Sequence, residues 1–201
     1  MPLSVAIIGT GGVGKAIGGN LAKRGVKVVF GSRDPAAARA KVAEGIKVAT
    51  VPKAISESAV VLLALPGAHD PAGLGQTVAG LGPGVAGKVV LDAMNPLSAY
   101  PGLEVFKAFN TIATKQMEHP DGSLVDGKQH SMMFAGGPEG RDIAEQVIAA
   151  AGFKPVWVGP IRFARNLEAL AELYIHLCVP GLTSGAPHWG HSWAFEVRKA
   201  E

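Results

Sequence analysis

The sequence holds little cysteine, little charge and no long apolar run. Cys178 is the single cysteine, which excludes a disulfide framework and a cysteine-rich zinc site and fits a reducing cytoplasm. The longest unbroken apolar run covers residues 59–65, which is far too short to span a bilayer. Residues 1–4 lead directly into a predicted strand, without the basic and apolar regions of a signal peptide. We therefore expect a soluble, cytoplasmic protein without a membrane partner.

Charge runs and catalytic motifs are equally sparse. The formal net charge is +3, and no run rich in Lys and Arg indicates a nucleic-acid partner. No Ser-His-Asp arrangement or pair of carboxylates supports hydrolysis. The six histidines lack the spacing of metal ligands, so no metal site is predicted. His69 follows a predicted strand and could face a crevice, and the segment from Pro180 to Trp193 is either an aromatic lid or a surface or subunit contact.

What the sequence does have is glycine, 27 residues in all. Residues 9–14 form a Gly-x-Gly-x-x-Gly turn between a predicted buried strand and a predicted helix. Gly9 permits the tight turn, Gly11 lets the backbone approach a pyrophosphate, and Gly14 lets the helix pack close to the strand. We therefore assign cofactor binding to Gly9, Thr10, Gly11, Gly12, Val13 and Gly14.

The end of the second predicted strand decides which dinucleotide is bound. An NAD enzyme usually has an acidic residue there for the ribose 2′-hydroxyl, whereas this chain has Ser32 and Arg33. A guanidinium makes bidentate, charge-assisted contacts with a 2′-phosphate, and the serine hydroxyl adds a hydrogen bond. The pair therefore predicts NADP(H). Arg39, in the following helix, is either a second phosphate contact or a solvated residue.

Strands alternate with helices along most of the chain, which predicts an α/β, Rossmann-like, doubly wound and mostly parallel sheet. We expect a single NADP-binding domain over 1–201, with the sheet core in 1–160 and a C-terminal helix and irregular tail in 161–201. Strands are predicted over 3–8, 26–30, 46–49, 59–64, 88–91, 105–109, 131–135 and 154–158, and helices over 13–24, 35–44, 52–57, 138–151 and 161–177, with a short helix before residue 88.

In such a sheet the ligand lies across the carboxyl ends of the strands. Leu65 and Pro66 follow the fourth predicted strand, and we expect them beneath the adenosine-side ribose and the pyrophosphate. Asn95-Pro96 and Asn110-Thr111 follow later strands and would reach the nicotinamide. An asparagine amide offers donors and acceptors that suit a carboxamide, although an Asx-turn after the strand is an equal alternative.

Several of these segments resemble one enzyme family, the NADPH-dependent oxidoreductases typified by coenzyme F420:NADP oxidoreductase. The Lys-Ala-Phe-Asn block within residues 105–112 is the most specific part, and it is also similar to the cytosolic NADPH-flavin domain of the six-transmembrane ferric reductases. The resemblance covers about residues 3–177 and rests on residues 9–14, 31–33, 95–96, 105–112, 133–137 and 152–160.

The resemblance implies direct hydride transfer between nicotinamide C4 and a stacked ring, either a deazaflavin (F420) or a flavin such as FAD or FMN. Such a reaction depends on geometry more than on an acid or base, because the two ring systems carry the chemistry. It therefore implies no catalytic acid or base, with Asn95, Asn110 and Thr111 as positioning residues and a small molecule as the second substrate.

Two other functions remain open at this stage. An imine reductase resembling pyrroline-5-carboxylate reductase begins with a similar nucleotide-binding half, but this chain lacks a long all-helical second domain, and its helix over 161–177 contains no lysine to act as a general acid. An NADPH-binding sensor or scaffold without turnover needs the same glycine turn and the same Arg33. The last helix is expected to dock onto the sheet; the alternative is a homodimer formed through it.

Overall fold

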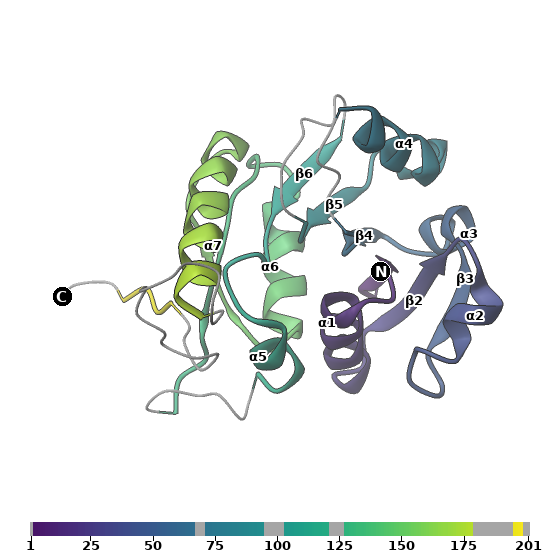
Figure 1. Cartoon of the computed structure of the whole chain (residues 1–201), viewed down its shortest axis with the longest axis horizontal. Coiled ribbons are helices and arrows are strands. Elements are labelled where there is room, and N and C mark those ends of the chain that lie inside the picture. The colour runs from purple at the N-terminus through teal and green to yellow at the C-terminus, as the bar shows by residue number, and fades with distance from the viewer. Residues whose placement is uncertain (1, 67–70, 95–102, 121–126, 179–194, 199–201) are drawn as a thin grey trace.

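The computed structural model describes residues 2–66, 71–94, 103–120, 127–178 and 195–198. Six strands form one parallel sheet in the order β3-β2-β1-β4-β5-β6. In this order two βαβ halves meet at a ligand crevice between β1 and β4, so the predicted doubly wound α/β fold is confirmed (Figure 1). The strands are β1 (Ser4–Ile8), β2 (Lys27–Ser32), β3 (Lys47–Thr50), β4 (Val60–Leu63), β5 (Val89–Asp92) and β6 (Glu104–Lys107).

The last two predicted strands do not extend this sheet. β7 (Ser131–Phe134) and β8 (Lys154–Trp157) pair in parallel as a second, two-stranded sheet. An antiparallel bridge joins the two sheets, because Lys107 N donates to Ala135 O at 2.8 Å and Ala135 N donates to Lys107 O at 3.0 Å. Lys107 is thus both the last residue of β6 and a point of attachment for the second sheet.

Helices connect the strands in the alternation that the sequence predicts. The predicted final helix begins as a 3₁₀ turn over Ile161–Phe163 and continues as a longer α-helix; a second 3₁₀ turn covers Pro83–Val85. The α-helices are α1 (Gly12–Lys23), α2 (Pro35–Arg39), α3 (Val51–Ser56), α4 (Pro71–Leu81), α5 (Thr114–Glu118), α6 (Arg141–Ala150) and α7 (Ala164–Cys178).

Alternate residues of the central strands face opposite helical layers. Val5 and Ile7 of β1 pack into the core that includes α1, α5 and α6, whereas Ala6 and Ile8 pack into the core that includes α3 and α4. All four side chains are buried. Because both faces of the sheet are covered, its strands are nearly continuous apolar runs rather than alternating ones.

Helix α2 is shorter than the prediction of 35–44, since it ends at Arg39. The Arg39 guanidinium donates to the carbonyls of Val42 at 3.0 Å and Ala43 at 2.6 Å, and also to the carbonyl of Ile46. These bonds satisfy carbonyl groups that a continuing helix would have bonded internally. Arg39 therefore holds the turn between α2 and β3, and its donors are directed at the backbone instead of a phosphate.

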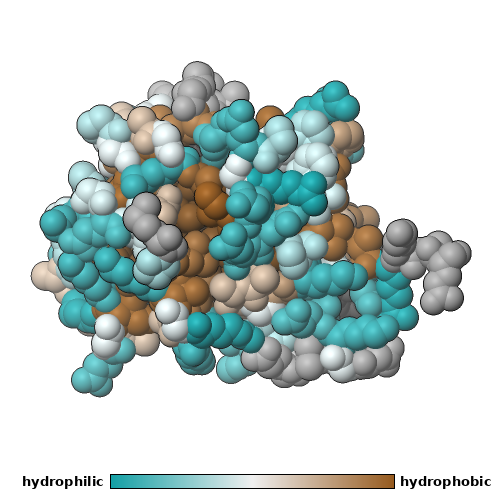
Figure 2. Space-filling model, turned by 180° about the vertical axis from the view of Figure 1, so that it is seen from behind, coloured by the Kyte–Doolittle hydropathy of each residue, from teal (hydrophilic) through white to brown (hydrophobic). Residues whose placement is uncertain are grey.

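Part of the surface is apolar. Leu173 of α7 is 50% exposed, and Ile161, just before α7, is 41% exposed. In the view from behind, Figure 2 shows further apolar surface in the middle of the face, bordered by hydrophilic side chains. Within the described residues, no helix has both the length and the apolar character needed to cross a bilayer.

Candidate functional site

The glycine turn lies between the end of β1 and the start of α1, at the carboxyl edge of the sheet. Gly9 has a φ of +124°, and a Cβ atom there would lie 2.3 Å from the carbonyl oxygen of Ala64. A Cβ at Gly14 would lie 2.2 Å from the carbonyl oxygen of Gly9. Both distances are far below van der Waals contact, and the contacted atoms are backbone. Glycine is therefore required at these two positions to form the turn itself.

Gly11 differs from its neighbours, because a Cβ added there would meet no atom within 4 Å. It is the N-cap of α1 but supplies no side-chain cap, and the first turn of the helix carries no acidic residue. The first N–H groups of α1 have no acceptor within the helix, and the positive end of the helix dipole lies there. The turn thus fits the pyrophosphate of a dinucleotide, with room for it beside Gly11.

Ser32 and Arg33 follow at the neighbouring strand end. The Ser32 hydroxyl donates to Asp34 O at 2.9 Å and accepts from Asp34 N at 3.1 Å, while the Asp34 carboxylate caps α2 by accepting from Ala37 N at 3.0 Å. Arg33 is exposed and makes no hydrogen bond or ion pair with the described residues. Arg33 is thus available to an anion, whereas the Ser32 hydroxyl must turn away from Asp34 to donate.

Leu65 and Pro66 continue from β4 beside the glycine turn. Leu65 is half-buried and packs on the core that includes α3 and α4, while Pro66 is exposed. The Gly9 position lies close enough that a Cβ there would be 3.3 Å from Leu65 N. The structure therefore brings this segment to the turn, while its place at the adenosine side of the site stays a prediction. His69, Asn95, Pro96 and the segment from Pro180 to Trp193 lie outside the described residues.

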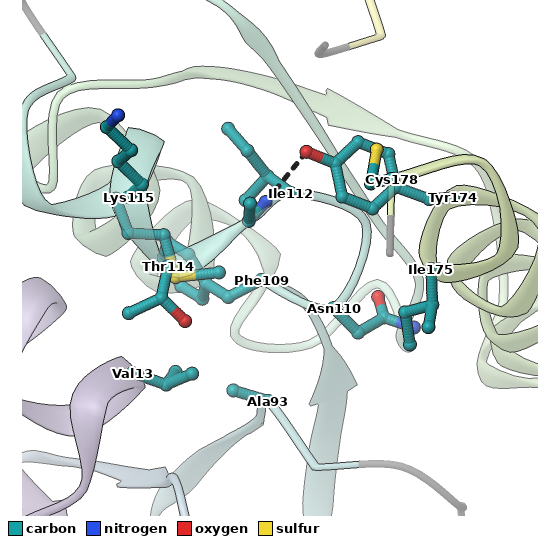
Figure 3. Close-up of a pocket in the computed structure, with 12 residues that line it drawn as sticks. Val13, Ala93, Phe109, Asn110, Ile112, Thr114, Lys115, Tyr174, Ile175 and Cys178 are labelled. Carbon is teal, nitrogen blue, oxygen red and sulfur yellow. Dashed lines mark hydrogen bonds between the residues drawn. The ribbon is translucent and has the colours of Figure 1, made fainter. Parts of the chain in front are cut away.

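A cavity of about 520 Å³ opens next to the glycine turn (Figure 3). Its walls come from the start of α1 (Val13), the residue after β5 (Ala93), the segment between Phe109 and Met117, and the last turns of α7 (Tyr174 to Cys178). A Cβ at Gly12 would lie 3.2 Å from the Thr114 methyl group, which places this lining residue directly beside the turn. Volumes of this size accommodate a ring system of cofactor dimensions.

The segment after β6 turns sharply to form one cavity wall. The sequence predicted a strand through Phe109, but β6 ends at Lys107, and Phe109 has a φ of +62°. This left-handed conformation is uncommon for a bulky residue, and burial of the ring among the core residues together with the bond from Phe109 N to Met132 Sδ (3.3 Å) holds it. The turn brings Asn110 to the cavity.

Asn110 and Thr111 differ in where they lie. Asn110 lines the cavity, and its Nδ2 donates to Leu167 O of α7 at 3.1 Å. Thr111 is buried and is not among the cavity-lining residues. The structure thus brings Asn110, but not Thr111, to the surface where a nicotinamide or its acceptor would lie.

Tyr174 is the polar group that α7 contributes to the cavity. Its hydroxyl accepts from Ala113 N at 3.3 Å, the dashed bond in Figure 3, and donates to Gln116 Oε1 at 3.4 Å. Burial raises the pKa of Tyr174 to about 12, and the neighbouring Cys178 adds to this shift. The hydroxyl therefore keeps its proton at neutral pH. Sequence reasoning missed this residue, which occupies a helical position typical of a core contact.

A buried charged cluster lies behind the cavity and was also missed. Lys107 Nζ is 3.2 Å from Asp92 Oδ2 and 3.1 Å from Glu168 Oε1, and it donates a further hydrogen bond to Met94 O. Burial raises the pKa of Asp92, while the charge of Lys107 opposes this shift. The available signal was a lysine in an apolar strand whose predicted neighbour ends in aspartate. Among the described residues, no group of three or more His, Cys, Asp or Glu is placed to hold a metal ion.

Strand order, glycine turn and uncapped helix start define a dinucleotide-binding protein of the Rossmann type. Residues 4–96 match the family described as NADP oxidoreductase coenzyme F420-dependent. The family resemblance expected from the sequence is thereby confirmed. The matched part contains the glycine turn, Ser32, Arg33 and β5.

Two curated proteins are similar to this chain in sequence. The chain is 25% identical to metalloreductase STEAP3 of Rattus norvegicus over 182 residues, which are 83% of this chain and 36% of that protein. It is 47% identical to the ketol-acid reductoisomerase (NADP(+)) of Beutenbergia cavernae over 67 residues, 33% of this chain and 20% of that protein. The chain thus spans about a third or less of the length of these relatives.

Solved structures share the fold. A protein of Arthrobacter sp. FB24 proposed to be an F420-dependent NADP-reductase superposes with a TM-score of 0.75 at 23% identity, covering 98% of this chain and 100% of that one. An imine reductase of Aspergillus terreus, solved with NADPH4 and dibenz[c,e]azepine, superposes with a TM-score of 0.66 at 25% identity, covering 86% of this chain and 61% of that one. The chain is therefore similar to NADP-dependent oxidoreductases in both sequence and fold.

Proposed function

We propose that the chain is an NADP(H)-dependent oxidoreductase that passes a hydride between the nicotinamide and a flavin-like ring, either the deazaflavin F420 or a flavin such as FAD or FMN. The NADP(H) is the group that supplies or accepts the hydride. The family match over residues 4–96 and the open space at Gly11 support the binding of this cofactor.

Different residues of the chain would bind different parts of the cofactor. The glycine turn and the start of α1 would hold the pyrophosphate, and Arg33 would pair with the 2′-phosphate. Asn110 and Ala93, on the cavity walls, would border the ring pair and keep water out. From the sequence, Asn95 and Pro96 would reach the nicotinamide, and Leu65 and Pro66 would support the adenosine side.

The cavity is the observation that carries the proposed reaction type. Its described lining contains no His, Asp or Glu, and its titratable groups are Lys115, Tyr174 and Cys178. Lys115 is exposed at one side of the opening, and Tyr174 holds its proton tightly. A reaction that relies on aligning two rings suits such a lining better than one that needs a strong general acid.

Stopped-flow mixing tests this function. NADPH-loaded protein mixed with F420, FAD, FMN and ferric chelates should lose nicotinamide absorbance with at least one acceptor. Tight NADPH binding without oxidation by any acceptor would contradict the proposal and favour a sensor or scaffold.

A substitution in the cavity sharpens the test. Ile175→Trp places a large ring in the cavity from α7 and should raise the KM for the acceptor about tenfold, while the Kd for NADPH stays unchanged. Ala169→Trp is the matched control, because Ala169 is exposed on the same helix and does not line the cavity. An equal effect of both substitutions would argue against this cavity as the acceptor site.

Imine reduction is the second candidate, and the structural similarity to the Aspergillus terreus imine reductase favours it. The proton-bearing Tyr174 hydroxyl, which lines the cavity, could then bond the substrate nitrogen. Cyclic imines in the same stopped-flow panel distinguish the two, and Tyr174→Phe should lower imine turnover far more than flavin turnover.

Two further features belong to the proposal. The exposed side chain of Leu173 and the half-exposed Ile161 on and before α7 support a homodimer formed through this helix. The lone, buried Cys178 supports a reducing, cytoplasmic location.

A further inference from the structure

The ammonium group of Lys107 is a three-way junction. An ammonium has three N–H donors and no acceptor, and three acceptors surround this one: Asp92 Oδ2, Glu168 Oε1 and the carbonyl oxygen of Met94. The Lys107 side chain is fully buried, with 0% of its surface exposed. Burying a charge this deeply is costly unless it is paired and hydrogen-bonded; here Lys107 Nζ donates to Asp92 Oδ2 and Met94 O and forms an ion pair with Glu168 Oε1.

The three acceptors come from two segments that border the cavity, the end of β5 and helix α7. Asp92 ends β5, and Asp92 and Met94 flank Ala93, which lines the cavity. Lys107 ends β6, directly opposite Asp92 in the strand pairing, and lies two residues before the turn at Phe109. Glu168 lies on α7 beside Leu167, whose carbonyl accepts from Asn110.

We propose that Lys107 is a positioning residue, which fixes the end of β5, the turn after β6 and helix α7 at the spacing that the cavity needs. It does not line the cavity, so it acts through the residues that do. Through Met94 O it also holds the residues that follow β5. This inference rests on the proposed hydride transfer for its kinetic consequence, whereas its structural consequence is independent of any reaction.

The electrostatics favour a junction over a simple packing contact. The Asp92 carboxylate is oriented by a second bond, since its Oδ1 accepts from Met94 N at 2.9 Å. Glu168 has 22% of its side chain exposed, so the contact between Lys107 and α7 lies near solvent. The contact between Lys107 and Asp92 is buried. Loss of the ion pair between Lys107 and Glu168 would therefore loosen the attachment of α7 without leaving a fully buried carboxylate unpaired.

Glu168→Gln is the mildest test, with Glu172→Gln as its control. Glu172 is an exposed residue one turn further along α7. Glu168→Gln should slow hydride transfer at saturating NADPH about fivefold or more, with an unchanged Kd for NADPH and little change in Tm. Glu172→Gln should change none of these quantities. Equal rates for both variants would overturn the proposal, as would a parallel loss of NADPH binding in Glu168→Gln.

Lys107→Met is the severe test, with Lys88→Met as its control. Lys88 donates to the carbonyl oxygen of Ser58 at the opposite, amino end of β5. Amide hydrogen exchange at Met94 should become about tenfold faster in Lys107→Met, while exchange at Val61 and Leu62 in the central strand stays slow. Lys88→Met should leave Met94 unchanged. If Lys107→Met does not fold, amide hydrogen exchange is measured on Glu168→Gln instead. Exchange at Asn110 should then be faster than in the wild type, and unchanged exchange there would overturn the proposal.

The two readouts separate this inference from the proposed function. If no acceptor oxidises NADPH in the wild-type protein, the proposed function fails, yet faster exchange at Met94 in Lys107→Met still supports the junction. If the wild-type protein turns over and exchange at Met94 is unaffected by Lys107→Met, the junction fails and the proposed function stands.

Discussion

Arg33 is the residue on which cofactor choice depends most directly. Its guanidinium is exposed at the end of β2 and is directed at none of the described residues, whereas the neighbouring Ser32 hydroxyl is engaged with Asp34. The predicted contribution of Ser32 to phosphate binding is therefore secondary, since its hydroxyl must first leave the Asp34 carbonyl.

Replacement of Arg33 by Ala should raise the Kd for NADPH by about 10- to 100-fold, because a charge-assisted contact contributes about 1.5–3 kcal/mol. The Kd for NADH should change by less than about twofold, since NADH lacks the 2′-phosphate. Fluorescence titration of both nucleotides measures the ratio, with Arg165→Ala on α7 as the control. Equal losses for both nucleotides would show that Arg33 does not contact the 2′-phosphate.

Asp92 gives a pH dependence whose sign follows from its burial. Burial raises its pKa in the folded protein, so at a pH between the ordinary carboxyl value of about 4 and the raised value, the unfolded chain has lost a proton that the folded chain keeps. The free energy of unfolding should fall as pH rises through this window. Asn cannot ionise, so Asp92→Asn should become more stable relative to the wild type with rising pH. Urea midpoints of both proteins across this range test the prediction, and parallel curves would refute it.

At the scale of elements, the β1–α1 turn was readable from the sequence because it is local. Glycine spacing, the preceding apolar run and the following helical pattern all lie within residues 3–24. The end of β6 was not readable in this way, since Phe109 adopts its left-handed conformation only because distant residues pack around it. The Lys107 junction depends on strand pairing and on α7, so three separate segments must be placed before it exists.

Substitutions in the glycine turn of residues 9–14 should affect folding and NADPH binding separately. Gly9→Ala and Gly14→Ala would drive a Cβ into backbone carbonyls, so each should lower the free energy of unfolding by about 2 kcal/mol or more. Gly11→Ala has open space around it and should keep the wild-type Tm within about 2 °C, yet bind NADPH about tenfold more weakly. Unchanged NADPH binding in Gly11→Ala would contradict the pyrophosphate position.

At the scale of the whole molecule, one face of α7 lines the cavity and the other is exposed to solvent. Tyr174 and Cys178 are buried against the cavity, whereas Leu173 is half exposed. If that outer face joins two copies, Leu173→Glu should convert a dimer into a monomer in analytical ultracentrifugation, since a charge at the centre of an apolar contact is strongly unfavourable. Glu172→Gln is the matched control. A wild-type protein that sediments as a monomer would dismiss the dimer.

The bridge between Lys107 and Ala135 joins the two sheets beyond the end of the family match, which stops at residue 96. Strands β1 to β5, with the glycine turn and Arg33, belong to the matched part, while the second sheet and α7 follow it. The cavity walls come largely from this later part, so under the proposed function changes there should alter which acceptor is reduced while β1 to β5 stay intact. The second sheet and α6 nevertheless share one core with β1 and α1, so acceptor specificity should be exchanged by substitutions at cavity-lining residues rather than by swapping a contiguous C-terminal segment.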